Sequence, residues 1–248
     1  MTQPILSIII PAYNEEDRLP PSLEKVAAFV NQQTMPIEII VVENGSKDHT
    51  YEVALSFQQK MANLRVIKEE KSGKGLAVRS GMLSAAGQYR IFCDADFSMP
   101  VEEVIKFIPA KPQDSYEVAI ASRELKDSRR VDEPEYRHLI GRVFNSMVRF
   151  SVLPGLQDTQ CGFKAFRADV AEAVFNKQTL PGWSFDAEVL VIARRMGYKI
   201  IEVPITWYYK PGTRLNIVKD SIKMASDLLT IRRNARLGLY DGRSKTAS

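Results

Sequence analysis

The segment Leu6-Ser7-Ile8-Ile9-Ile10-Pro11-Ala12-Tyr13-Asn14-Glu15-Glu16 decides the fold of this chain. It begins with an almost continuous run of apolar, β-branched residues, which is typical of a strand that is covered on both faces. The run stops at Pro11, and apolar residues then recur at helical spacing at Leu23, Val26 and Val30. A buried strand followed directly by a helix begins a βαβ unit, so the segment predicts a parallel sheet flanked by helices.

The same alternation continues to about residue 125. We expect further strands at 37–42, 64–67, 89–93 and 118–121, and helices at 53–61, 75–86 and 100–108. The fold class that follows is α/β, Rossmann-like, with a mainly parallel sheet and flanking helices.

Beyond residue 125 the pattern changes. The charged segment 127–136 contains a proline and predicts a mobile loop. The patterns that follow predict, in order, a helix at 140–148, a strand at 161–166, a helix at 189–196, a strand at 201–207 and an amphipathic helix at 217–236. Pro204 favours an edge position for the strand at 201–207, because proline cannot donate a backbone hydrogen bond. We expect one domain, 1–248, whose two halves meet near residue 125.

Composition excludes several classes of protein. Hydrophobic residues make up 45% of the 248 residues, which supplies a sizeable core and excludes a disordered chain. The net charge of +4 is too mild for a general nucleic-acid binder. Cys93 and Cys161 do not form a disulfide framework, and neither a signal peptide nor a run of 18 apolar residues is found. We therefore expect a cytoplasmic protein.

Polar residues follow three of the expected strands directly. These groups are Pro11–Glu16, Glu43–Ser46 and Asp94–Asp96. The carboxyl ends of parallel strands meet at one edge of a sheet, and ligands bind there in open α/β folds. Each residue alone could be a turn former or a helix cap. Taken together, the three groups predict a binding site.

Asp94 and Asp96 are the candidate metal ligands. In an extended segment, residues i and i+2 point the same way, so both carboxylates would face one cation. Mg²⁺ or Mn²⁺ takes one or two such carboxylates together with substrate phosphates, and would neutralise charge on a leaving diphosphate. The Lys71–Gly75 segment, with Lys74 in it, could cradle a phosphate at a helix start, or be a flexible basic turn. It does not match the P-loop pattern, which disfavours an ATPase.

Together these residues resemble the family 2 glycosyltransferases, most closely the dolichyl-phosphate glucose and dolichyl-phosphate mannose synthases. The likeness runs from about residue 5 to 235. Its second-half motifs are Asp158-Thr159-Gln160-Cys161-Gly162-Phe163-Lys164, which resembles the glucosyl branch, and Trp183-Ser184-Phe185-Asp186-Ala187-Glu188. The first-half motifs are the three strand-end groups, Lys74-Gly75 and Ser122-Arg123.

The resemblance implies a GT-A fold and an inverting, metal-dependent transfer of a hexose to a polyprenyl or dolichyl phosphate. UDP-glucose is the favoured donor and GDP-mannose the next. Residues 1–125 would be the nucleotide-sugar-binding half, 126–216 the acceptor half, and 217–248 the C-terminal helix and tail.

Site roles carry over by position. Pro11, Tyr13 and Glu15 would line the nucleobase and ribose pocket, and Lys74 would bind the donor. Arg123 and Arg137 would hold the acceptor phosphate, and Arg214 would lie on a loop that closes over the donor. One departure concerns Glu43 and Asn44, because the family has two acidic residues at these positions. Asn44 can still hydrogen-bond a base, but the identity of that base stays open.

The acceptor decides which catalytic groups are needed. A phosphate monoester is largely a dianion at neutral pH and already a nucleophile, so no general base is required. If the acceptor were a hydroxyl, Asp186 or Glu188 would be the candidate base. Asp158 has either a structural role, holding the strand near Cys161, or a catalytic one.

A lipid acceptor requires contact with a membrane surface. The apolar stripe from Ile140 to Val152, with Arg142 and Arg149 opposite, and the C-terminal helix could lie in an interface; core packing is the alternative. The chain would then be peripheral at the cytoplasmic face of a membrane, or recruited by a membrane protein. Two other functions stay open: transfer to a soluble or glycan acceptor, and a silent module that only binds nucleotide sugars.

Overall fold

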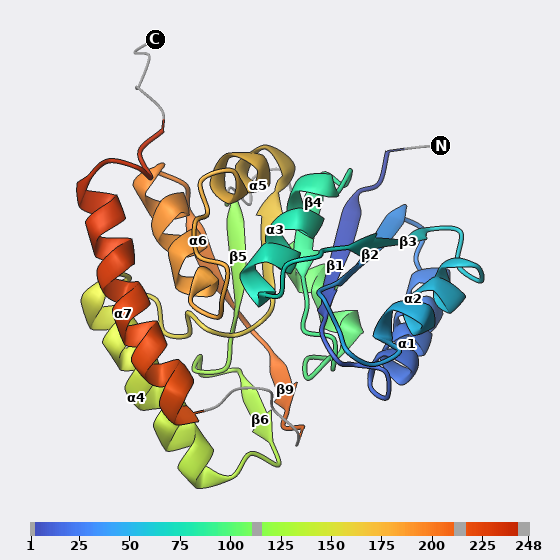
Figure 1. Cartoon of the computed structure of the whole chain (residues 1–248), viewed down its shortest axis with the longest axis horizontal. Coiled ribbons are helices and arrows are strands. Elements are labelled where there is room, and N and C mark those ends of the chain that lie inside the picture. The colour runs from blue at the N-terminus through green and yellow to red at the C-terminus, as the bar shows by residue number, and fades with distance from the viewer. Residues whose placement is uncertain (1–2, 111–115, 211–216, 243–248) are drawn as a thin grey trace.

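A computed structural model describes residues 3–110, 116–210 and 217–242, without the side chains of 136, 137, 139, 140, 143, 144 and 217–222. Its centre is a seven-stranded sheet in the order β3-β2-β1-β4-β7-β5-β8 (Figure 1). The strands are β1 Leu6–Ala12, β2 Ile37–Glu43, β3 Leu64–Lys68, β4 Tyr89–Phe92, β5 Val118–Ser122, β7 Lys164–Arg167 and β8 Ile200–Pro204. Within the sheet only β7 is antiparallel to its neighbours, β4 and β5. The expected α/β fold with a mainly parallel sheet is confirmed.

Helices cover both faces of this sheet (Figure 1). One apolar cluster joins the sheet to α1 Leu19–Asn31, α2 Thr50–Gln58 and the 3₁₀ helix η1 Val101–Phe107. The other cluster joins the opposite face to α3 Lys74–Ser84, α5 Ala168–Phe175, α6 Phe185–Arg195 and α7 Ile217–Arg236. Alternate strand residues serve the two clusters: Ile8 and Ile10 pack on the first, and Ile9 on the second. This is why β1 is apolar at every position except Ser7, whose buried hydroxyl is hydrogen-bonded to Glu38 and to the Gly87 amide.

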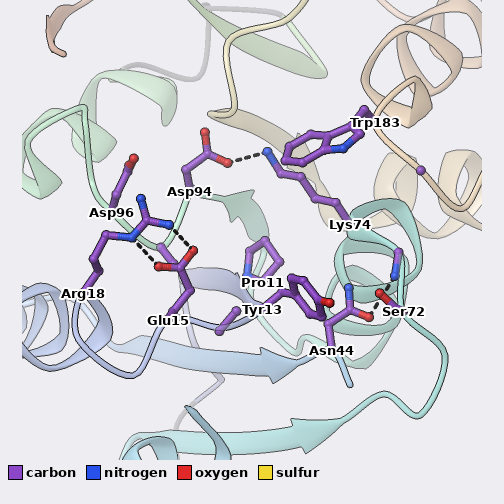
Figure 2. Close-up of a pocket in the computed structure, with 14 residues that line it drawn as sticks. Pro11, Tyr13, Glu15, Arg18, Asn44, Ser72, Lys74, Asp94, Asp96 and Trp183 are labelled. Carbon is purple, nitrogen blue, oxygen red and sulfur yellow. Dashed lines mark hydrogen bonds and ion pairs between the residues drawn. The ribbon is translucent and has the colours of Figure 1, made fainter. Parts of the chain in front are cut away.

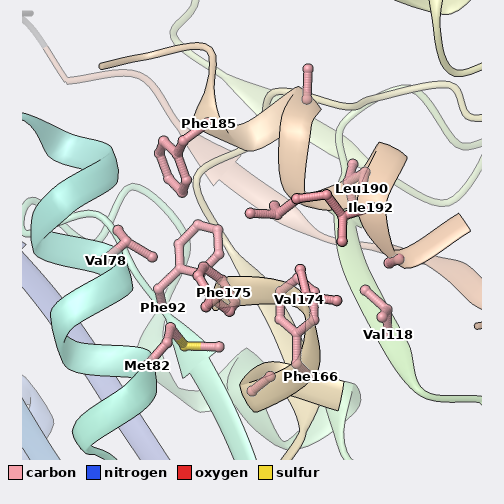
Figure 3. Close-up of a cluster of buried hydrophobic side chains, with 14 of the residues drawn as sticks. Val78, Met82, Phe92, Val118, Phe166, Val174, Phe175, Phe185, Leu190 and Ile192 are labelled. Carbon is pink, nitrogen blue, oxygen red and sulfur yellow. The ribbon is translucent and has the colours of Figure 1, made fainter. Parts of the chain in front are cut away.

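The second cluster holds α3, α5 and α6 against the sheet (Figure 3). The rings of Phe92 and Phe185 pack at 5.5 Å between centroids, and those of Phe166 and Phe175 at 5.2 Å. Gly81 on α3 lies so close to the sheet that a methyl group there would stand 2.4 Å from Ile9 Cγ2. The second half of α3 therefore packs directly on β1 and β2.

Four expectations need correction, three in the second half of the chain and one for the helix expected at 100–108. The segment 127–136 contains a short strand, β6 Arg129–Val131, and the first residues of α4 Glu135–Ser151. The strand expected at 201–207 is divided, because Pro204 ends β8 and the chain then leaves the sheet as β9 Thr206–Tyr208, which pairs with β6. Pro204 does lie on the edge strand, as expected. The helix at 100–108 is a 3₁₀ helix, and the strand at 161–166 begins only at Lys164.

Among the helices that the structure describes, none has the length and apolar character needed to cross a bilayer.

Candidate active site

A cavity of about 340 Å³ opens at the carboxyl ends of β1, β2 and β4, beside the start of α3 (Figure 2). All three strand-end groups contribute to its wall. The lining residues are Pro11, Ala12, Tyr13, Glu15, Arg18, Asn44, Ser72, Gly73, Lys74, Asp94, Ala95, Asp96, Gly182 and Trp183. The cavity therefore brings together residues that are far apart in the sequence.

The turn after β1 is fastened to the segment that follows β2. The backbone amide of Asn14 donates to Ser46 Oγ at 3.1 Å, and its side-chain oxygen accepts the Lys47 amide at 2.8 Å. The Glu15 amide donates to Thr50 Oγ1 at 2.7 Å. These bonds explain the cluster of short polar residues after each strand: they join the two turns into one rigid rim.

Glu15 and Arg18 form a bidentate ion pair on the cavity wall. The guanidinium donates to the two carboxylate oxygens at 2.6 and 2.5 Å. Burial opposes the charge on Arg18, but Glu15, Asp96 and Asp94 outweigh it, and the pKa of Arg18 is raised. Sequence reasoning missed Arg18, although its spacing of three residues from Glu15 at a helix start is typical of such a pair.

Glu43 and Asn44 occupy different places. Glu43 is buried, is absent from the cavity wall, and accepts the Ser46 amide at 2.5 Å. Asn44 lines the cavity, and its side-chain oxygen accepts the Gly73 amide at 3.1 Å. Asn44 thus links the end of β2 to the loop before α3. Glu43 instead stabilises the turn that follows β2, through its hydrogen bond with the Ser46 amide.

Asp94 and Asp96 line the same wall of the cavity (Figure 2). The segment between them is a turn and not extended, which corrects the geometry expected for it. The Phe97 amide donates to the Asp94 carbonyl at 3.0 Å, and Phe97 has a φ of 46°. Asp96 Oδ1 accepts the amide and the hydroxyl of Ser98, both at 3.0 Å. Both carboxylates therefore line the cavity because of the hydrogen bonds of this turn, and not because alternate residues of a strand point the same way.

Lys74 lies beside Asp94 at the start of α3. Its ammonium is 2.5 Å from Asp94 Oδ1 and 5.1 Å from the centre of the Trp183 ring. Burial disfavours the ammonium, but the carboxylates of Asp94 and Asp186 outweigh it, so the pKa of Lys74 is raised. Lys74 is therefore a charged group at the cavity. The motif that contains Trp183 did not predict its contact with Lys74, because the two residues are far apart in the sequence.

Gly162 packs directly behind Asp94. A Cβ at this position would stand 2.0 Å from Asp94 Oδ2 and 2.6 Å from Oδ1. Only a residue without a side chain allows the carboxylate to take this position. The motif Cys161-Gly162-Phe163-Lys164 thus supports the acidic turn from the segment that leads into β7.

Asp186 stands behind the cavity and does not line it. It is 5% exposed and accepts Lys164 Nζ at 2.5 Å, while the same ammonium donates to the Cys161 carbonyl at 2.6 Å. Burial raises the pKa of Asp186 despite the opposing charges of Lys164 and Lys74. The other candidate base, Glu188, is fully buried and accepts the amides of Thr179 and Leu180. Neither carboxylate reaches the cavity.

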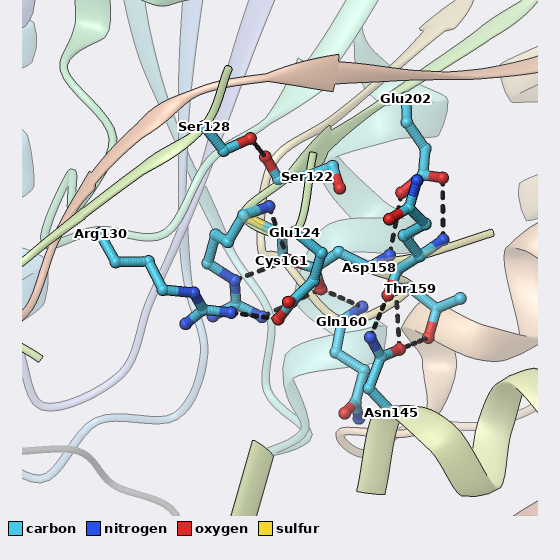
Figure 4. A network of polar contacts seen from close by, with 12 residues as sticks. Ser122, Glu124, Ser128, Arg130, Asn145, Asp158, Thr159, Gln160, Cys161 and Glu202 are labelled. Atoms are coloured by element: carbon cyan, nitrogen blue, oxygen red, sulfur yellow. Dashed lines mark hydrogen bonds and ion pairs between the residues drawn. The ribbon is translucent and has the colours of Figure 1, made fainter. Parts of the chain in front are cut away.

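Arg123 is paired with Asp158, which belongs to the network of polar contacts in Figure 4. Its guanidinium donates to both carboxylate oxygens at 2.7 and 3.0 Å, and its amide donates at 3.1 Å. Asp158 is 1% exposed; burial would raise its pKa, but Arg123 lowers it to about 2. Arg123 does not line the cavity. The side chain of Arg137, and Arg214 altogether, lie outside the described residues.

The donor set fits a divalent cation that is shared with a substrate. Among the described residues, no group of three or more acidic, histidine or cysteine side chains forms a complete metal site. Asp94 and Asp96 offer carboxylate oxygens at one wall, which is the partial set that Mg²⁺ and Mn²⁺ use when substrate phosphates complete the coordination.

Comparison with known proteins agrees with this geometry. The family described as glycosyl transferase family 2 matches residues 7–175. Dolichyl-phosphate beta-glucosyltransferases are similar over almost the whole chain: that of Trichomonas vaginalis is 34% identical, covering 98% of this chain and 77% of the relative. Those of Saccharomyces cerevisiae and Homo sapiens are 34% and 32% identical, covering 97% and 92% of this chain and 78% and 74% of the relatives.

A solved structure shows the same fold. Glucosyl-3-phosphoglycerate synthase of Mycobacterium tuberculosis, in complex with Mn²⁺, UDP-glucose and phosphoglyceric acid, has a TM-score of 0.65 and 18% identity. The match covers 98% of this chain and 82% of that one. The expected GT-A-type fold is thereby confirmed.

Proposed function

Because the chain belongs to glycosyl transferase family 2, we propose that it transfers a glucosyl group from UDP-glucose to a polyprenyl phosphate such as dolichyl phosphate. The observation that carries the proposal is the cavity with Asp94, Asp96 and Lys74 on its wall. The names of the relatives support a dolichyl-phosphate acceptor and a glucosyl group. GDP-mannose is the second candidate donor.

The cavity suits a nucleoside diphosphate sugar. Its volume of about 340 Å³ is in the range of small-ligand sites. We assign Pro11, Tyr13 and Glu15 to the nucleobase and ribose, with Asn44 facing the base. Glu43, which does not reach the cavity, would act by fixing the turn that carries Asn44.

Asp94 and Asp96 would hold Mg²⁺ or Mn²⁺ together with the diphosphate, and the cation would neutralise charge on the leaving group. Lys74 supplies a second positive charge at the same wall. Its contact with Asp94 keeps that carboxylate oriented, and Trp183 limits where the ammonium can move. The chain's own contribution is then positioning and electrostatic stabilisation.

A phosphate acceptor fits the residues better than a hydroxyl acceptor. A hydroxyl needs a general base, and both candidate bases are buried and engaged: Asp186 by Lys164, and Glu188 by the loop at Thr179. A phosphate dianion needs none. Arg123, held by Asp158, would act with Arg137 on that phosphate through its remaining donors and its charge. The chain would work at the cytoplasmic face of a membrane.

The test is a transfer assay with detergent-solubilised polyprenyl phosphate. We expect product from UDP-glucose with Mg²⁺ or Mn²⁺, less from GDP-mannose, and none when simple saccharides replace the lipid phosphate. Transfer to saccharides alone would favour the soluble-acceptor function. Donor binding without transfer to any acceptor would favour a silent nucleotide-sugar-binding module.

Gly162→Ala should reduce this transfer strongly. The added methyl group cannot coexist with the Asp94 carboxylate in its present position, so Asp94 or the segment just before β7 must shift. A shift of about 1 Å near reacting groups costs about 100-fold in rate. The measurement is kcat/KM. The matched control is Gly141→Ala on α4, where the added atom meets nothing within 4 Å. Equal kcat/KM for Gly162→Ala and the unsubstituted chain would remove Gly162 from this role.

A further inference from the structure

Glu188 on α6 is a buried carboxylate that the proposed reaction does not use. It accepts the Thr179 hydroxyl at 2.5 Å, the Leu180 amide at 2.8 Å and the Tyr240 hydroxyl at 2.8 Å. The Thr179 amide also donates to both of its oxygens at 3.1 Å. These donors come from two segments: the loop of residues 178–183, which we call the α5–α6 loop, and the turn after α7. Glu188 therefore joins this C-terminal turn to the α5–α6 loop.

Tyr240 is the residue of the C-terminal turn that reaches Glu188. Its side chain is fully buried, and its hydroxyl oxygen also accepts the side-chain amide of Asn234 at 3.1 Å. Burial and the charge of Glu188 raise the pKa of Tyr240, so the phenol keeps the proton that it donates. The next residue, Asp241, accepts two hydrogen bonds from Arg195 near the end of α6, at 2.7 and 3.2 Å. The C-terminal turn is thus fastened to α6 at two points.

The other side of the α5–α6 loop contacts the start of α3. The Gly75 amide donates to the Pro181 carbonyl at 2.9 Å, and the Gln178 side-chain amide donates to the Gly75 carbonyl at 2.9 Å. The approach is close, because a Cβ at Gly73 would stand 2.5 Å from the Pro181 carbonyl oxygen. The loop and the helix start that carries Lys74 therefore pack backbone against backbone, and a displacement of one displaces the other.

The same loop supplies part of the cavity wall. Gly182 and Trp183 line the cavity, and the Trp183 ring lies 5.1 Å from the Lys74 ammonium (Figure 2). We propose that Glu188 and Tyr240 are positioning residues of the donor site, because they hold the α5–α6 loop, and with it Trp183, against Lys74. The C-terminal turn would then control a cavity that it does not line. The inference rests on the proposed function in one respect only: it takes the cavity to bind the sugar donor.

The first test is Tyr240→Phe in the full chain, which keeps the buried ring and removes the hydroxyl. We expect KM for UDP-glucose to rise about tenfold, because a lost hydrogen bond to a charged group leaves the loop in its binding position in only a fraction of the molecules. The kcat should stay within about twofold, since the loop is in place once the donor is bound. Glu188→Gln should raise KM further, because an amide has one acceptor oxygen where the carboxylate has two.

The second test needs no ligand and no reaction. In a Trp207→Phe background, Trp183 is the one tryptophan of the chain, so its fluorescence reports on the α5–α6 loop alone. We expect acrylamide to quench this fluorescence more strongly when Tyr240→Phe is added, because a loosened loop exposes the indole ring to the quencher.

The matched control is Ser7→Ala, which removes a buried hydroxyl that donates to Glu38 at 2.6 Å. Ser7 lies at the amino end of β1 and does not line the cavity. This variant should lower the unfolding temperature much as Tyr240→Phe does, yet leave both KM and the quenching unchanged. If Ser7→Ala raises both as strongly as Tyr240→Phe, general destabilisation is the cause and the positioning role is overturned.

Two further outcomes separate this inference from the proposed function. Glucosyl transfer by the unsubstituted chain, with unchanged KM or unchanged quenching in Tyr240→Phe, refutes the positioning role alone. Stronger quenching in Tyr240→Phe, in a chain that transfers no sugar, supports the hold on the loop and refutes the proposed function alone.

Discussion

Asp96→Asn is expected to reduce sugar transfer about 1,000-fold while the chain stays folded. Asparagine keeps a side-chain oxygen that can accept the amide and hydroxyl of Ser98, so the turn should persist. What is lost is the negative charge at the cavity wall, on which the proposed cation and diphosphate depend. Removing one preorganised electrostatic group from a transition state costs about 100- to 1,000-fold in rate, and a ligand to the cation belongs at the upper end of that range.

The measurement is kcat with saturating donor and Mn²⁺, together with a thermal unfolding curve to show that the fold is retained. Asp17→Asn is the matched control, because Asp17 is an exposed carboxylate near the same rim that does not line the cavity. Its kcat should equal that of the unsubstituted chain. An Asp96→Asn variant with more than half of the original kcat would show that the charge has no catalytic role.

Asp158→Asn is expected to lower the free energy of unfolding by about 3 kcal/mol at pH 7. Removing one partner of a buried ion pair leaves the other charge poorly solvated and costs about 3–5 kcal/mol. Asp158 is 1% exposed and Arg123 retains 21% of its side-chain surface, which places the expectation at the lower end. Denaturant titration measures the change. The matched control is Asp169→Asn, which removes an equally bidentate but exposed pair with Arg167 and should cost under about 1 kcal/mol.

The same pair gives a pH dependence with a definite sign. Arg123 depresses the pKa of Asp158 from its ordinary 3.8 to about 2 in the folded chain. A carboxylate with a depressed pKa stabilises the fold above its unfolded pKa and loses that contribution as the pH falls through the folded value. The difference in stability between Asp158→Asn and the unsubstituted chain should therefore be full above about pH 4 and shrink towards pH 2.

Much of the fold follows from local pattern. The apolar β1 and the alternation after it predicted the parallel half of the sheet, because buried strands and amphipathic helices leave strong periodic signals. The reversed strand β7 could not be predicted from its own residues, since four apolar and polar positions carry no information about direction. Pro204 predicted the edge position of β8, because proline cannot donate a backbone hydrogen bond. Its own residues did not predict that the chain leaves the sheet there and that β9 pairs with β6.

In the candidate site too, some residues could be predicted from local sequence pattern and others only from the tertiary structure. Strand-end residues such as Asp94 and Asn44 could be found because parallel strands bring their carboxyl ends together. Trp183 comes from a loop 109 residues after Lys74 in the sequence. The packing of Phe185 on Phe92 and the hydrogen bond from the Gly75 amide to the Pro181 carbonyl, at 2.9 Å, bring this loop to the start of α3. The buried partners of Arg123 and Asp186 were also beyond reach, since ion pairs between distant segments depend on tertiary structure.

Calorimetric titration with UDP, with and without Mn²⁺, tests the central claim most directly: the cavity beside Asp94 and Asp96 binds a nucleoside diphosphate through a shared cation. We expect clear binding with Mn²⁺, binding at least tenfold weaker without it, and no effect of Mn²⁺ in Asp96→Asn. Equal UDP affinity with and without Mn²⁺ in the unsubstituted chain, or an unchanged Mn²⁺ effect in the variant, would contradict the assignment of these carboxylates.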